Sequence, residues 1–249
     1  MPKTVLIPLP THDFDPTEAA VPWRILSSAG LQITFATPDA LPAHCDARML
    51  NGRGLGILAP LLCADKNAQE AYAEMSNAPE FLNPKKWSNM NHQEFDGVLL
   101  PGGHAPGMRE YLESPILQKL VAEFFKFDKP VGAICHGVVL AARSKAESGQ
   151  SVLFHRKTTA LLASQELAAW LLTSLWLGNY YRTYPATVET EVKANLAHPA
   201  QFVKGPSPIR RDSLQNLRPG FIVQDRNYIS ARWPGDAHTF GSKFLTMLQ

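Results

Sequence analysis

The residues best suited to chemistry lie in the stretch Val131–Gly137, where Cys135 and His136 follow an apolar run. A strand that ends in a reactive residue and turns at once into a helix presents that side chain at the carboxyl edge of a parallel sheet, where such sheets bind ligands. The turn requires small residues two positions before and after the nucleophile, and Ala133 and Gly137 occupy those positions. The positive end of the following helix favours thiolate and predicts a lowered pKa for Cys135. We therefore interpret Cys135 as a nucleophile, although free cysteine is also a common buried core residue.

A second apolar run, Gly97–Pro101, is followed by Gly102, Gly103 and His104. Glycine allows backbone amides to approach a substrate closely, so the amides of Gly103 and His136 are candidates for an oxyanion hole. The alternative is that the two glycines only form a turn. These residues are expected to bind substrate if they lie beside the cysteine.

Histidines outside this stretch raise the question of a metal site. His104 follows the glycine pair, and His12 with Asp13 follows the first apolar run, so each could reach the same edge of the sheet or simply be solvated. The chain has no H-x-x-x-H pair and no clustered Asp and His spacing. We predict no metal and no cofactor.

The elements that must position these residues follow a repeating pattern. Asp15, Pro16 and Glu18 form a helix start with Asp15 as N-cap, and the helix ends at Gly30. Strands alternating with helices predict an α/β fold with a doubly wound, mostly parallel sheet and helices on both faces, of flavodoxin-like type. The predicted strands are Thr4–Leu9, Gln32–Thr37, Gly97–Pro101, Pro130–Cys135, Thr158–Leu162 and Phe221–Arg232, and further helices are predicted from Ser114, from Val138, at Gln165–Leu177 and at Ala237–Leu248.

Length and composition predict one α/β domain over residues 1–249, with insertions at about 40–94 and 178–220 that build over the sheet edge or the mouth of the site. The net charge of +2 and the lack of charge runs give no reason to expect a nucleic-acid partner. No segment has the length of a membrane span or the pattern of a signal peptide, so we expect a soluble, cytoplasmic protein. Three cysteines without C-x-x-C spacing predict neither a disulfide framework nor a thiolate zinc site.

Together, Phe95–His104, Val131–Gly137 and Glu18 resemble the ThiJ/PfpI superfamily, which has the class I glutamine amidotransferase-like fold. The long first insertion and Glu166 are most similar to the branch of the heat-shock chaperone and glyoxalase III. The resemblance implies Cys135 as nucleophile, His136 as its neighbour in the catalytic set and Glu18 as the carboxyl group that hydrogen-bonds the thiol.

Two roles within this set have alternatives. An ionised carboxylate beside a thiolate would repel it, so Glu18 must be held protonated by burial to act as a donor. The alternative for Glu18 is a capping-box glutamate. His136 needs an orienting partner from elsewhere, and the resemblance suggests Glu166. The alternative for Glu166 is an acid in the first turn of a helix. A late His-x-Glu pair, which glutamine amidotransferases carry, is absent, so ammonia production from glutamine is disfavoured.

The resemblance favours a cysteine-dependent, cofactor-independent lyase of glyoxalase III type that acts on small α-oxoaldehydes. Two alternatives remain: a peptidase or amidase that works through an acyl-enzyme on a peptide substrate, and a stress-responsive holdase chaperone or redox sensor. A homodimer is expected from the superfamily.

Overall fold

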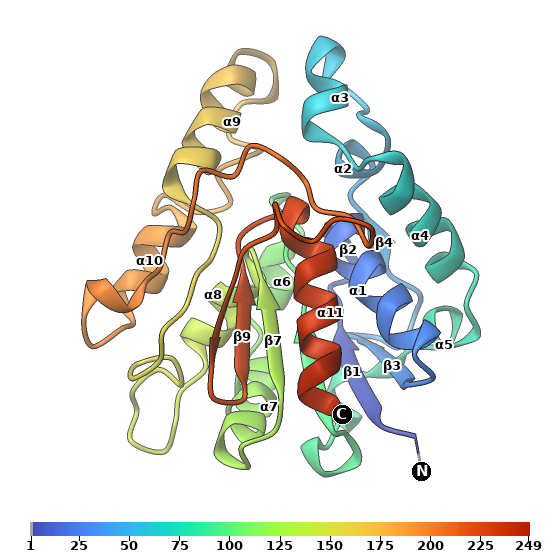
Figure 1. The fold of residues 1–249 in the computed structure, drawn as a ribbon, viewed down its shortest axis with the longest axis vertical. Coiled ribbons are helices and arrows are strands. Elements are labelled where there is room, and N and C mark those ends of the chain that lie inside the picture. The colour runs from blue at the N-terminus through green and yellow to red at the C-terminus, as the bar shows by residue number, and fades with distance from the viewer. Residues whose placement is uncertain (1) are drawn as a thin grey trace.

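The computed structural model describes residues 2–249, and its centre is a seven-stranded sheet (Figure 1). The strand order is β5-β3-β1-β6-β7-β9-β8, and every neighbouring pair is parallel except β8 with β9. The strands of this sheet are β1 (Thr4–Pro8), β3 (Gln32–Thr37), β5 (Lys85–Lys86), β6 (Gly97–Leu100), β7 (Val131–Ile134), β8 (Ile222–Asp225) and β9 (Tyr228–Ala231), and a separate two-stranded sheet pairs β2 (His12–Phe14) with β4 (His44–Cys45). The predicted doubly wound, mostly parallel sheet is confirmed.

Helices cover both faces of the sheet, which explains why its central strands are apolar along their whole length. Packing contacts place α1 and α11 on one face and α7 and α8 on the other (Figure 1). All residues of β6 and β7 are buried. The helices are α1 (Pro16–Ser28), α2 (Ala47–Asn51), α3 (Ala59–Leu62), α4 (Lys66–Ser76), α5 (Pro79–Leu82), α6 (Met108–Leu112), α7 (Pro115–Lys126), α8 (Gly137–Arg143), α9 (Ala163–Leu177), α10 (Val188–Ala194) and α11 (Ala237–Leu248).

The start of α1 follows from its first residues. The side chain of Asp15 accepts hydrogen bonds from the amides of Thr17 and Glu18, and Pro16 is the first helical residue. An N-cap carboxylate of this kind satisfies amides that have no partner inside the helix. The predicted N-cap is confirmed, and it fixes the place of Glu18 in the first turn.

Two predicted strands are wrong. The segment 158–162 forms only an isolated bridge between Thr158 and Phe202. The edge of β9 is taken by β8, so this segment does not pair there. The predicted strand Phe221–Arg232 is instead an antiparallel hairpin of β8 and β9, which turns at Arg226 with a φ of 57°.

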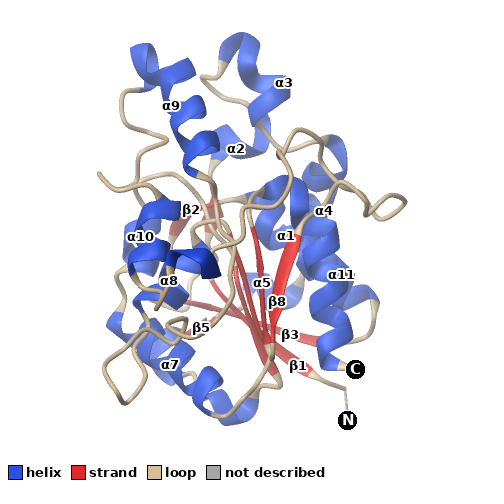
Figure 2. Ribbon diagram, turned by 60° about the vertical axis from the view of Figure 1, so that its left-hand side comes forward, coloured by secondary structure: helices blue, strands red, loops and turns tan. Residues whose placement is uncertain are grey.

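The two predicted insertions contribute to the sheet edge and to a cap. Within residues 40–94, β5 pairs with β3 at the end of the sheet, while α2 and α3 rise above the carboxyl ends of the strands. Helix α9 stands opposite them at the same end of the molecule (Figure 2). Within residues 2–249, no helix is long and apolar enough to cross a membrane.

Candidate active site

Cys135 directly follows β7 and has a φ of 56°. Residues other than glycine rarely adopt this conformation, which is found at strained functional turns between a strand and a helix. The amide of Cys135 donates to the carbonyl of Ala231 on β9 at 3.0 Å, which holds the turn against the sheet. At Gly137, the first residue of α8, an added Cβ would lie 2.1 Å from the carbonyl oxygen of Leu100. Only glycine fits where α8 passes the end of β6, and the predicted tight turn is present.

Glu18 reaches the same point from α1 and is fully buried. Its Oε2 accepts a hydrogen bond from the amide of Gly102 at 2.9 Å, and the amide of Asp15 donates to the carbonyl of Gly102 at 2.8 Å. A capping box requires the glutamate to accept from the N-cap amide, and here the carboxyl bonds Gly102 instead. Glu18 is therefore directed toward Cys135, and each of the two side chains influences the pKa of the other.

Burial sets the protonation states of the pair. Burial and the nearby Asp15 raise the pKa of Glu18 well above its usual value, which favours the protonated form of this carboxyl group. Burial is also the main cause that raises the pKa of Cys135 well above its usual value, while the amide of His136 opposes the shift. The predicted lowering of the Cys135 pKa is wrong because burial outweighs the dipole of α8, which is only seven residues long. Cys135 is a neutral thiol.

His136 lies between the thiol and a hydroxyl group. Its Nδ1 is 3.5 Å from the sulfur of Cys135, and its Nε2 is 3.2 Å from Oγ1 of Thr183. Thr183 already donates its own hydroxyl hydrogen to the carbonyl of His104 at 2.6 Å, so it can only accept from Nε2–H. Nδ1 therefore carries the lone pair that faces the thiol. Burial, with the positive charge of Arg143, lowers the pKa of His136 well below its usual value, so the ring is a neutral base.

Glu166 does not orient His136 as the resemblance suggested. Its Oε2 accepts from the amide of Val188 at 2.9 Å, at the start of α10, and its Oε1 lies 3.6 Å from Nε of Arg182. Burial raises its pKa to about 7. The carboxyl group thus joins α9 to α10, and the side chain that orients His136 is Thr183.

The glycine pair lies beside the acid and the thiol. A Cβ added to Gly102 would lie 2.7 Å from both Oε2 of Glu18 and the amide nitrogen of His136, so only glycine allows these groups to meet. A Cβ added to Gly103 would lie 2.6 Å from the carbonyl oxygen of Asp13. The amide of Gly102 is engaged by Glu18, whereas that of Gly103 donates to no acceptor within residues 2–249. The oxyanion hole from Gly103 and His136 stays a prediction.

His104 packs edge to face against His136, with ring centroids 5.1 Å apart. Burial lowers the pKa of His104 to about 4, so it is also neutral. His12 instead lies exposed on β2, and Asp13 accepts from the amide of Gly107 at 2.8 Å. Across residues 2–249, no group of three or more His, Cys, Asp or Glu side chains is arranged to hold a metal ion.

Three residues of the site have no motif in the sequence. Thr183 and Tyr181 come from the second insertion, where no periodic pattern indicates their position. Arg109 on α6 fixes Thr183 by donating to its carbonyl through Nε at 3.1 Å. The signal that could have found them is indirect: a buried catalytic histidine needs a partner for its second nitrogen.

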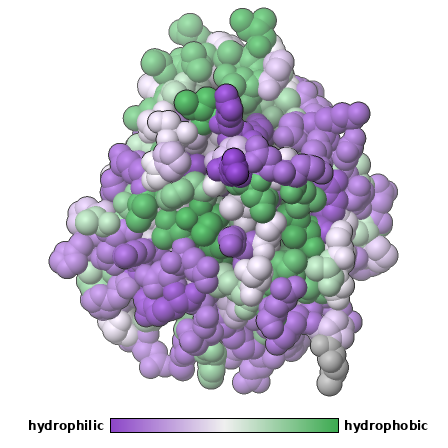
Figure 3. All heavy atoms as spheres, in the orientation of Figure 1, coloured by the Kyte–Doolittle hydropathy of each residue, from purple (hydrophilic) through white to green (hydrophobic). Residues whose placement is uncertain are grey.

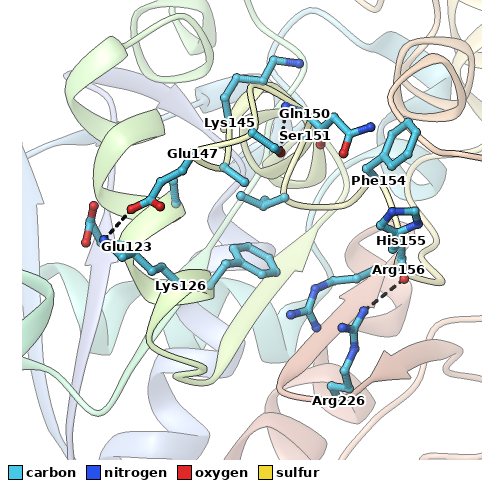
Figure 4. Close-up of a pocket in the computed structure, with 15 residues that line it drawn as sticks. Glu123, Lys126, Lys145, Glu147, Gln150, Ser151, Phe154, His155, Arg156 and Arg226 are labelled. Carbon is cyan, nitrogen blue, oxygen red and sulfur yellow. Dashed lines mark hydrogen bonds and ion pairs between the residues drawn. The ribbon is translucent and has the colours of Figure 1, made fainter.

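A separate cavity of about 430 Å³ lies between α7 and residues 145–156, away from the cysteine (Figure 4). Its charged side chains largely pair with their surroundings: Lys126 bonds Glu147 at 2.7 Å, and Arg226 donates to the carbonyl of His155 at 3.0 Å. None of the predicted site residues lines it. The chemistry of the chain is therefore to be sought at Cys135.

Comparison with known proteins identifies the family and similar folds. A family model described as ThiJ/PfpI family-like matches residues 9–206. An uncharacterized protein of Schizosaccharomyces pombe is 33% identical over 120 residues, which are 47% of this chain and 43% of that protein. A glutathione-independent glyoxalase of the same yeast is 25% identical over 147 residues, 58% of each chain. Both matches therefore cover less than two thirds of the relative's own length. The crystal structure of glyoxalase III from Candida albicans shares the fold, with a TM-score of 0.72 and 16% identity over 99% of this chain and 98% of that chain.

Proposed function

Because the chain belongs to the ThiJ/PfpI family, we propose that it is a cysteine-dependent, cofactor-independent enzyme that converts α-oxoaldehydes to 2-hydroxy acids. The observation that carries the proposal is the Nδ1 of a neutral His136, 3.5 Å from the sulfur of Cys135, with the fully buried carboxyl group of Glu18 close enough for the two side chains to shift each other's pKa. A thiol, a base and an acid in one buried place supply what proton transfer around a carbonyl requires. A relative that is named as a glutathione-independent glyoxalase supports the same reaction class.

In the first step, the sulfur of Cys135 bonds to the aldehyde carbon while its proton passes to Nδ1 of His136 and then to the aldehyde oxygen. The product is a hemithioacetal. In this proposal, the amides of Gly103 and His136 stabilise the developing negative charge on that oxygen. No metal is needed for this addition, because the thiol supplies the nucleophile and the imidazole accepts the proton.

In the second step, His136 removes the hydrogen on the thiol-bearing carbon as a proton, and Glu18 protonates the neighbouring ketone oxygen to give an enediol. His136 then returns its proton to the former ketone carbon, and Glu18 recovers one from the other hydroxyl group. The result is a thioester of a 2-hydroxy acid. Water breaks the carbon–sulfur bond, which releases the acid and restores the thiol. One carbon is oxidised and its neighbour is reduced, so no external oxidant is required.

The test is incubation of the purified protein with methylglyoxal and quantification of lactate. We expect lactate from the wild type and none from Cys135→Ala, while Cys63→Ala, which changes a thiol outside the site, retains activity. Lactate formation that persists in Cys135→Ala would refute the proposal. Cleavage of fluorogenic peptides with a trapped acyl-enzyme, in place of lactate formation, would assign the same cysteine to a hydrolase.

A holdase is the second candidate, because the cap carries exposed apolar side chains. Apolar atoms gather at the top of the molecule in Figure 3, over the ends of α3 and α9. The most exposed apolar residues there are Ile57, Leu61, Leu171, Leu175 and Trp176. Contiguous apolar surface of this kind marks an interaction site. Suppression of client aggregation that survives Cys135→Ala and is lost in Leu175→Lys would assign this activity to the cap.

A further inference from the structure

A cavity of about 300 Å³ lies at the carboxyl end of the sheet, between α3 and α9. Its walls are almost entirely apolar and come from both insertions and from the turn before α11. The apolar lining residues are Met49, Leu61, Leu62, Leu161, Ala168, Ala169, Leu172, Tyr181, Pro208, Ile209, Trp233 and Pro234. Methylglyoxal carries a single methyl group, which leaves most of such a volume unfilled.

The cavity borders on the reactive residues. His104 and Tyr181 line it and pack edge to face, with ring centroids 5.0 Å apart. The His104 ring also contacts His136, which faces the sulfur of Cys135. Because Cys135 is fully buried, a side chain must move before a carbonyl group can reach the sulfur. His104 thus connects the cavity to the pair of Cys135 and His136.

Unpartnered polar atoms collect around this cavity. Nine buried side-chain N or O atoms lack a hydrogen-bond partner within residues 2–249, and five of them belong to residues that line it. These five are Nδ1 of His104, Oε1 of Gln165, Oη of Tyr181, Nη1 of Arg211 and Nε1 of Trp233. Buried polar atoms nearly always have partners, and those that lack one call for an explanation. A ligand that carries a polar group on an apolar body would fill the cavity and provide hydrogen-bond partners for these atoms.

Two of these atoms are donors on adjacent side chains. The guanidinium of Arg211 lies over the ring of Trp233, 5.6 Å from its centroid. Nη2 of Arg211 is fixed by the carbonyl of Cys63 at 2.9 Å, which leaves Nη1 without an acceptor. A guanidinium and an indole N–H can both donate to an acceptor oxygen of a ligand. A carboxylate binds more strongly than a neutral acceptor, because its bond to the guanidinium is charge-assisted.

We propose that the substrates of this site are α-oxoaldehydes that carry an apolar, preferably aromatic, substituent with an acceptor group at its far end. This proposal rests on the proposed function and narrows its substrate class. The aromatic body fills the cavity between α3 and α9, the distal acceptor bonds Arg211 and Trp233, and the aldehyde is directed past His104 toward Cys135.

The experiment compares kcat/KM for methylglyoxal, phenylglyoxal and 4-carboxyphenylglyoxal. We expect kcat/KM for phenylglyoxal to be about tenfold or more higher than for methylglyoxal, because a phenyl group buries far more apolar surface than a methyl group. We expect a further gain for the carboxylated compound that Arg211→Met abolishes. Ala168→Phe, which adds bulk at a residue that lines the cavity, should lower the ratio of kcat/KM for phenylglyoxal to that for methylglyoxal, whereas Leu167→Phe, at an exposed neighbouring residue that does not line it, should not.

Binding separates failure of this proposal from failure of the proposed function. The probe is 4-carboxymandelate, titrated into Cys135→Ala by calorimetry, with and without Ala168→Phe. Turnover of methylglyoxal without preference for the aryl compounds overturns the substrate class and leaves the lyase standing. If no oxoaldehyde reacts, the lyase fails, and binding that Ala168→Phe and Arg211→Met abolish still supports the cavity as an aryl carboxylate site. Absence of such binding overturns it.

Discussion

Replacing Thr183 with valine removes the hydroxyl group that sets the tautomer of His136. The hydroxyl accepts from Nε2 at 3.2 Å and donates to the carbonyl of His104 at 2.6 Å, and all three residues are buried. A buried N–H without an acceptor costs about 1–3 kcal/mol, which favours the tautomer that carries its hydrogen on Nδ1. That tautomer faces the thiol of Cys135 with a donor and cannot take its proton. A cost of about 1–3 kcal/mol corresponds to a loss of about 5- to 150-fold in the reactive form, and the middle of that range is about 10- to 100-fold.

The assay is site-resolved alkylation by iodoacetamide between pH 7 and 9, read by mass spectrometry. We expect Cys135 to react about 10- to 100-fold more slowly in Thr183→Val and within about threefold of wild type in Thr183→Ser. Cys63 serves as an internal control, because it lies outside the site and is only partly buried. Equal rates at Cys135 in wild type and Thr183→Val would refute the tautomer argument. A parallel change at Cys63 would attribute the effect to unfolding, and the argument would fail in that case too.

Three further variants test the site. Glu166→Gln should leave alkylation of Cys135 within about twofold, because Glu166 bonds Val188 and not His136; a loss comparable to that of Thr183→Val would restore it as the orienting acid. Glu18→Gln should raise the melting temperature at pH 8 but not at pH 4. The pKa of Glu18 is higher in the folded than in the unfolded state, so the wild type loses stability as pH rises above the pKa of the unfolded state. Equal shifts of the melting temperature at both pH values would contradict burial of a protonated acid. Gly137→Ala, whose Cβ would lie 2.1 Å from a carbonyl oxygen, should lower the free energy of unfolding by about 3 kcal/mol or more in chemical denaturation. Gly149→Ala, where space is open and only the positive φ is unfavourable, should lower it by about 1 kcal/mol. Similar losses in the two variants would remove the steric reason for glycine at the turn.

Local chemistry explains which parts of the fold were predictable. The central strands are apolar because helices cover both faces, and Asp15 with Pro16 marks the start of α1 through bonds made within a few residues. The segment 158–162 has β-prone residues, yet strand formation depends on pairing with a neighbouring strand, and the edge of β9 is paired with β8. The hairpin of β8 and β9 was missed because its turn places Arg226 at positive φ, where glycine or asparagine is the usual signal.

The same distinction applies to the site. Cys135 and Gly137 were accessible because a tight turn leaves local marks in the sequence, whereas the role of Glu18 beside the thiol came from the family resemblance. Thr183 was not, since it meets His136 across 47 positions and belongs to an insertion without periodicity. A long-range partner of this kind is defined only by packing. The family resemblance suggested Glu166 for this role, but the carboxyl group of Glu166 contacts Val188 and Arg182 instead.

The neutral thiol has a consequence for the kind of electrophile the site accepts. Peroxides are attacked by thiolates, so a cysteine whose pKa is raised by burial is poorly suited to sensing them. Addition to an aldehyde differs, because the thiol proton is needed in the product and His136 can transfer it as the carbon–sulfur bond forms. A buried thiol, a neutral base and a protonated acid therefore favour carbonyl addition over oxidation. On this argument, the alkylation rate of Cys135 rises with pH without a plateau up to pH 9, whereas a plateau near pH 7 would indicate a resting thiolate and reopen the redox function.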